Sequence, residues 1–198
     1  MVIHARFLAG IFLLVSFCAM GGCGRSVRYG DPRAVETVTA EFGSTDLQMI
    51  AQKMAKSLSD APALWDKRPV LYVAQVKNKT TEHIDTQNIT DSIRTQLLKS
   101  GKVRFTAAME VNQDLVQQLQ YQIDSGMVRP DTARKMGQQI GADYFLYGVI
   151  TEIHKKAGRV EDTYFKFTLN LVNIETALID WADEKEIRKV TKRRVFGG

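Results

Sequence analysis

The two cysteines of this 198-residue chain both lie near its N-terminus, and their position limits what can hold the folded part together. Cys18 lies within an apolar run from Phe7 to Ala19, and Cys23 follows that run after the small residues Gly21 and Gly22. A basic start, a short apolar run and small residues before a cleavage point are typical of a secretory leader. As a helix of about 20 Å, the run is too short to cross a hydrocarbon core of roughly 30 Å. The folded part therefore has no thiol, which excludes disulfides and cysteine-ligated metals, and its stability must come from a packed core.

The residues around Cys23 resemble the end of a bacterial lipoprotein signal peptide, whose cysteine is acylated with fatty acids such as palmitate. Cys18 is a poor alternative, because the bulky Phe17 precedes it where the peptidase cleft is narrow. We therefore expect a signal peptide over residues 1–22 and lipidation at Cys23. Gly24 follows where inner-membrane lipoproteins often carry Asp, so the resemblance implies an anchor in the outer membrane that faces the periplasm. An ordinary cleaved signal with an incidental cysteine is the alternative.

The rest of the chain is long enough for one domain and a tether. Residues 23–45 are polar and irregular, which predicts a lipidated tether, and residues 46–198 are expected to form a single globular domain. The net charge of +5 includes a basic cluster near the C-terminus, which we interpret as a solvated tail; contact with an acidic partner surface is the alternative. The cluster contains Lys185, Arg188, Lys189, Lys192, Arg193 and Arg194. Nucleic acid is not expected as a partner outside the cytoplasm.

Apolar residues at helical spacing predict four helices, over residues 45–59, 86–100, 110–124 and 130–141. Thr45 and Gln48 form a capping-box pattern at the start of the first helix. Asp85 or Thr86 caps the second helix, and Gly101 ends it.

Strands are predicted over residues 70–76, 103–106, 144–153, 163–172 and 178–185. The fourth alternates cleanly, with Phe165, Phe167, Leu169 and Leu171 toward the core and polar neighbours between them. The first is apolar throughout, as expected for a strand covered on both faces. This order of elements predicts an α/β fold: a mixed β-sheet with helices packed on it and a C-terminal antiparallel meander of three strands.

The sequence shows no arrangement that supports catalysis. His83 and His154 remain after removal of the leader, and neither has a second ligand at metal-binding spacing. No serine lies in a Gly-x-Ser-x-Gly turn, and no glycine-rich loop with a lysine is present to hold phosphate. We therefore interpret the chain as a non-enzyme, with no cofactor, no metal and no small-molecule substrate.

Three segments resemble the LpoB family: residues 69–80 (PVLYVAQVKNKT), residues 141–148 (GADYFLYG), and residues 171–176 with Trp181 beyond. The TolB N-terminal domain and CsgG have similar folds, so the resemblance implies a TolB N-terminal domain-like fold. Where the family carries a Thr-Gly turn, this chain has Thr176-Ala177, and we expect a longer loop that avoids a positive φ at Ala177.

The resemblance implies an outer-membrane lipoprotein that binds and stimulates a bifunctional class A penicillin-binding protein and so regulates peptidoglycan synthesis and cell shape. Docking would favour the active conformation of the synthase, to the extent that the activator binds that conformation more tightly. A CsgG-like lipoprotein of envelope secretion or assembly and a passive envelope scaffold are the alternatives. A cell-wall hydrolase is disfavoured because no catalytic set is evident.

Two groups of residues are candidates for partner binding. The first is a polar loop after the first strand, at a position where sheet proteins present binding groups: Asn78, Lys79, Thr80 and His83. The second is Tyr144 and Tyr147, which point to opposite faces of one strand, so that at least one should be partly exposed, with Arg134 adding a charge. The alternative is that both tyrosines cap the core and Arg134 is solvated.

Overall fold

The computed structural model describes residues 27–62, 68–106 and 141–192, together with positions 117, 121, 125, 135 and 138, which are helical. The chain divides into two units at Ala34 and Val35, and the fold described below is that of the second unit. Cys23, Arg134 and most of the predicted helices over residues 110–124 and 130–141 lie outside the described residues.

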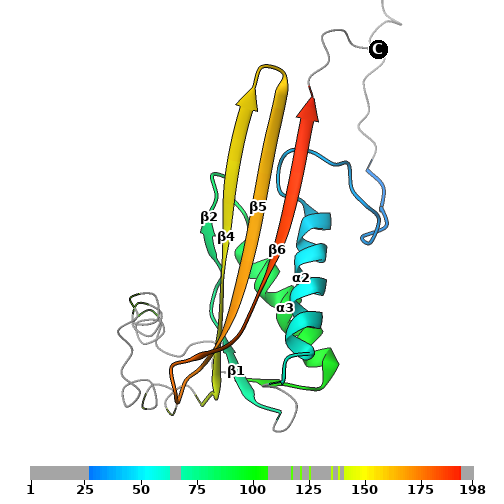
Figure 1. Ribbon diagram of the computed structural model, residues 1–198. Helices are drawn as coiled ribbons and strands as arrows, with labels where there is room; N and C mark the ends of the chain where they lie inside the picture. Colours follow the sequence, from blue (N-terminus) through cyan, green and yellow to red (C-terminus); the bar gives the residue numbers. More distant parts are fainter. Residues whose placement is uncertain are drawn as a thin grey trace, which may run out of the picture. The chain divides into compact units, whose positions relative to one another are not determined.

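The domain is a mixed sheet of six strands with two helices packed on one face, which confirms the predicted fold class (Figure 1). The strands are β1 (Val70–Val73), β2 (Lys77–Lys79), β3 (Arg104–Phe105), β4 (Tyr144–Ala157), β5 (Val160–Asn173) and β6 (Ile179–Lys192). Their order is β3-β1-β4-β5-β6, and β2 pairs with β4 beyond the end of β1. The first three strands pair in parallel, whereas β4, β5 and β6 form the predicted antiparallel meander.

The main core lies between the sheet and helices α2 (Ser44–Ser59) and α3 (Thr86–Ser100), and we call this side of the sheet the helix face. The predicted alternation in β5 is confirmed, because its four apolar residues are buried on this face. These residues are Phe165, Phe167, Leu169 and Leu171. A smaller cluster around Phe145 lies on the opposite side, which we call the second face. Both clusters are built from residues between Phe42 and Ile187, so a chain that begins at Gly24 retains the whole described core.

The start of α2 differs from the prediction. Its N-cap is Gly43, whose N–H donates to the carboxylate of Asp46 at 2.8 Å, so the capping box predicted at Thr45 and Gln48 is wrong. The hydroxyl of Thr45 instead accepts a hydrogen bond from the N–H of Glu36 at 3.2 Å. By contrast, the ends of α3 confirm the prediction: Asp85 caps it, and Gly101 ends it in the left-handed conformation at φ 70°.

The meander strands extend further than their apolar residues indicate. Each of them has 14 residues, and most of the basic cluster near the C-terminus lies within β6. The strand predicted over residues 70–76 ends at Val73, and residues 74–76 lie between β1 and β2, where the register against β4 shifts by one residue. Because β4 and β5 each have 14 residues, their hairpin extends beyond the packed part of the sheet.

The turn between β5 and β6 is tight, and the expectation of a longer loop there is wrong. Ala177 has φ 60°, and its N–H donates to the carbonyl of Asn173 at 2.8 Å. The side-chain oxygen of Asn173 also accepts from the N–H groups of Glu175 and Thr176 at 2.9 and 3.1 Å. These bonds hold Ala177 in a left-handed conformation that is unfavourable for a residue with a Cβ atom.

We expect Ala177→Gly to raise the free energy of unfolding by about 0.5–1 kcal/mol, since glycine adopts a positive φ without a steric penalty. Urea denaturation at equilibrium measures this change. Ala182→Gly is the matched control, because Ala182 is an exposed residue within β6 and its replacement should lower stability by about 0.5–1 kcal/mol. Equal losses in both variants would contradict a strained turn.

Candidate functional site

The predicted polar loop begins within β2, which contains Asn78 and Lys79, and its turn is organised by its own side chains. The side-chain oxygen of Asn78 accepts hydrogen bonds from the N–H and the hydroxyl of Thr80, at 2.9 and 2.8 Å. The amide nitrogen of Asn78 donates to the carbonyl of Glu82 at 2.8 Å, which closes the loop. Lys79 and His83 are exposed on this preformed turn. The loop therefore presents its polar groups without needing to be ordered by a partner.

Two carboxylates fix the loop to the rest of the domain. Glu152 of β4 accepts from the N–H and the hydroxyl of Thr81, both at 2.9 Å. Glu82 accepts from the N–H of Phe42 at 2.8 Å, which joins the loop to the segment before α2. The loop is thus tied to β4 and to the segment before α2.

The segment before α2 is fixed to the domain from Glu36 onward. The Glu36 carboxylate accepts from the N–H of Thr45 at 3.1 Å and from the hydroxyl of Ser44 at 2.9 Å. These hydrogen bonds, that from the Thr45 N–H first, hold the pKa of Glu36 below its usual value. Phe42 packs edge-on against Phe165 with ring centroids 5.8 Å apart. We call residues 36–43 the clamp segment.

Tyr144 and Tyr147 lie on opposite faces of β4, as alternation requires, and both are partly exposed. Tyr144 packs on the helix face, where burial, followed by the negative charge of Asp180, raises its pKa. Tyr147 packs on the second face against Phe145, with ring centroids 5.9 Å apart.

A third tyrosine, which the sequence analysis missed, joins Tyr147 on the second face. Tyr72 of β1 stacks on Phe145 at 5.8 Å between centroids and 6° between planes. The parallel register that pairs Tyr72 with Phe145 creates this contact, and no pattern within β1 alone indicates it. Burial raises the pKa of Tyr72, so the phenol remains protonated and can donate a hydrogen bond. We call Tyr72, Phe145 and Tyr147 the tyrosine row.

The predicted site residues do not form one continuous site. Asn78 pairs with Ile150, which places Tyr147 three positions and Tyr144 six positions away along β4. At the usual rise of a strand these separations are about 10 and about 20 Å. The structure brings together the polar-loop residues Asn78, Lys79, Thr80 and His83. Arg134 lies outside the described residues.

The described ranges contain no group of three or more histidine, cysteine or carboxylate side chains that could hold a metal ion. Within the same part of the chain, no helix is long and apolar enough to cross a lipid bilayer.

Residues 46–187 match the family model described as peptidoglycan-synthase activator LpoB. No curated protein matches the chain.

Several solved structures are similar to this chain at low sequence identity. The LpoB C-terminal domain from Salmonella enterica is 18% identical, with a TM-score of 0.48, and the match covers 72% of this chain and 98% of that domain. The corresponding domain from Escherichia coli is 19% identical, with a TM-score of 0.45 and coverages of 70% and 97%. A lipoprotein from Neisseria meningitidis is 20% identical, with a TM-score of 0.44 and coverages of 62% and 83%.

Proposed function

The chain belongs to the LpoB family of peptidoglycan-synthase activators, and from this premise we propose that it binds and stimulates a bifunctional class A penicillin-binding protein. In this proposal Cys23 carries the lipid that anchors the chain in the outer membrane, and the domain faces the periplasm. The family match over residues 46–187 is the observation that carries the proposal, because it spans both helices and almost the whole sheet.

The clamp segment sets how far the domain extends from the anchor. Only residues 24–36 separate Cys23 from the fixed part of the chain, a distance of at most about 45 Å when extended and about 20 Å as a coil. The clamp contacts Phe165, which pairs with Glu152, whereas the tyrosine row lies near the start of β4. At about 3.3 Å per residue, Phe145 and Tyr147 are therefore about 23 and about 17 Å further along the sheet from that contact. In this proposal the tyrosine row lies toward the end of the domain that is further from the anchor and faces a synthase anchored in the inner membrane.

The tyrosine row supports a docking role because tyrosines combine a large apolar ring with a polar hydroxyl, and such residues often dominate binding energy. Tyr72 and Tyr147 flank the buried ring of Phe145, which fixes their positions before binding. Tyr144, on the opposite helix face, and Arg134, which lies outside the described residues, remain predicted contacts, and the polar loop provides a second contact region in this proposal. A tenfold stimulation by conformational shift requires about tenfold tighter binding to the active state.

The proposal is tested by adding the chain from Gly24 onward to its cognate synthase and measuring glycan polymerisation and peptide cross-linking on lipid II. We expect both rates to rise several-fold, with saturation at the concentration that saturates binding. In this proposal the chain docks on a small regulatory domain of the synthase, so a synthase variant without that domain is the control and should not respond. Absence of both binding and stimulation would reject the proposal, and a ring-shaped oligomer in detergent would favour the secretion alternative.

A further inference from the structure

The hairpin that joins β4 and β5, together with the end of β6, extends beyond both helices (Figure 1). The first turn of α2 meets β6 at Lys189, which pairs with Thr163 of β5. The strands continue past that level to the turn at Gly158. We call residues 153–160 and 188–192 the hairpin tip.

The second face of the hairpin tip mixes apolar and basic side chains. Cross-strand partners share a face, which places Ile153, Val160 and Val190 on one surface with Lys155, Arg188 and Lys192. The apolar members are unusually open to solvent: Ile153 is 56% exposed, Val190 61% and Val160 37%. Apolar side chains gathered on an exposed projection favour contact with another surface.

The hairpin tip carries an excess of positive charge. Its two neighbouring carboxylates are already paired, Asp162 with Arg188 at 2.5 Å and Glu161 with His154 at 3.3 Å. Lys155, Arg159 and Lys192 form no ion pair within the described part of the chain. These cations are therefore available to a negatively charged partner.

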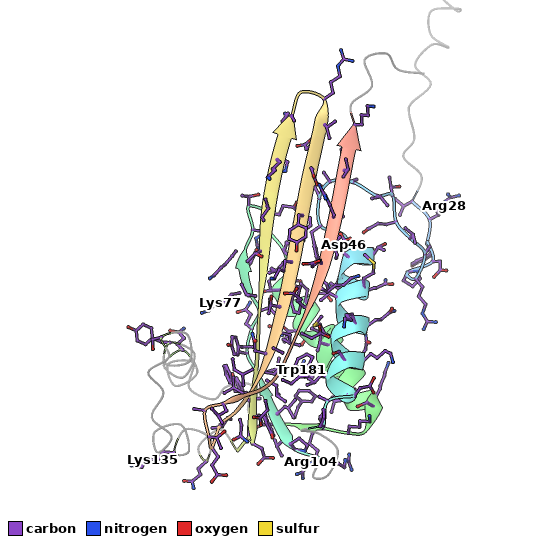
Figure 2. All side chains as sticks on the ribbon, in the orientation of Figure 1. Arg28, Asp46, Lys77, Arg104, Lys135 and Trp181 are labelled. Atoms are coloured by element: carbon purple, nitrogen blue, oxygen red, sulfur yellow. The ribbon has the colours of Figure 1, made fainter. Side chains whose placement is uncertain are left out.

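The clamp segment, through which the chain enters the domain, lies close to the hairpin tip. Lys189 donates a hydrogen bond to the carbonyl of Glu41 and forms an ion pair with Asp46, so the clamp lies at the base of the tip (Figure 2). From Glu36, residues 24–36 lead back to Cys23 within at most about 45 Å. A lipid at Cys23 would thus hold the hairpin tip near a membrane surface.

We propose that the hairpin tip binds the anionic phospholipid surface of the membrane that holds the lipid anchor. The cations contact lipid phosphates, and Ile153, Val160 and Val190 enter the interfacial layer. With the sheet upright on its tip, this contact keeps the tyrosine row, which lies on the same face near the start of β4, away from the membrane. The choice of the outer membrane as the bound surface rests on the proposed anchor at Cys23. The hairpin tip itself binds anionic phospholipid without the lipid anchor.

The test uses the chain from Gly24 onward, without acylation, and sedimentation with vesicles of phosphatidylglycerol and phosphatidylcholine or of phosphatidylcholine alone. We expect binding to the anionic vesicles only, and we expect it to weaken strongly in 0.5 M salt. The triple variant Lys155→Glu, Arg159→Glu and Lys192→Glu should bind at least about 100-fold more weakly, since each cation contributes about fivefold. Ile153→Ser with Val190→Ser should also weaken binding while leaving the charge unchanged.

The matched control reverses three exposed cations at the other end of the domain, Lys56, Lys99 and Arg104, where Figure 2 labels Arg104. Because both triple variants change the net charge equally, only the hairpin-tip variant should lose binding. Equal losses in the two variants, no preference for anionic vesicles, or binding to isolated peptidoglycan instead of vesicles would each overturn the inference. Stimulation of the synthase in detergent should be unaffected by the hairpin-tip variant, so failure here is distinguishable from failure of the proposed function.

Discussion

Replacing Lys189 by methionine is expected to lower the free energy of unfolding by about 3–5 kcal/mol, because it leaves a buried carboxylate without its cation. The ammonium of Lys189 lies 2.5 Å from the carboxylate of Asp46, and the two side chains are only 9% and 5% exposed. Lys189 also donates to the carbonyl of Glu41. The variant therefore loses the link between β6, the first turn of α2 and the clamp segment.

Equilibrium unfolding in urea, followed by circular dichroism, measures the loss. Lys166→Met is the matched control, because Lys166 pairs with Glu184 at 2.8 Å but the two side chains are 40% and 46% exposed. An exposed pair of this kind contributes at most about 1 kcal/mol. Adding Asp46→Leu to Lys189→Met should recover part of the stability by removing the unpaired charge. A loss at Lys189 no larger than at Lys166 would show that the buried pair does not stabilise the domain.

This ion pair also shows which features the sequence could not predict. The ends of α3 follow from Asp85 and Gly101, and the core face of β5 follows from alternation, since both depend on residues close together in the chain. The cap of α2 depends instead on Asp46, whose position is fixed by Lys189 at the far end of the sequence. Local patterns favoured Thr45 because they contain no information on that contact.

In the candidate site, too, some features follow from residues close together in the chain and others depend on contacts between distant segments. Alternation alone places Tyr144 and Tyr147 on opposite faces of β4. The contact between Tyr72 and Phe145 depends on the parallel register of β1 and β4, which two short apolar segments leave undetermined. Likewise, the predicted strand ended at residue 153 although β4 continues to Ala157, because this exposed end of the hairpin carries Lys155 and Lys156 and shows no apolar alternation.

Removing both tyrosines of the tyrosine row is expected to weaken binding to the synthase by at least about 30-fold, the effect of losing about 2 kcal/mol at a binding hot spot. The change is Tyr72→Ala with Tyr147→Ala, which deletes the two rings that flank Phe145. Titration of the synthase with the variant measures the affinity, and the concentration that gives half-maximal stimulation should rise by the same factor. Circular dichroism and urea unfolding establish that the variant remains folded.

A second pair of variants separates docking from packing. Tyr72→Phe with Tyr147→Phe keeps both rings and removes only the hydroxyls, so it should preserve the fold and lose a smaller part of the affinity. Tyr164→Ala is the control, because Tyr164 lies on the second face near the hairpin tip, where its hydroxyl bonds to Glu186 at 2.5 Å, and its loss should leave stimulation unchanged. Full stimulation by a folded Tyr72→Ala and Tyr147→Ala variant would move the docking surface to the polar loop, where Asn78→Ala then becomes the variant expected to lose binding.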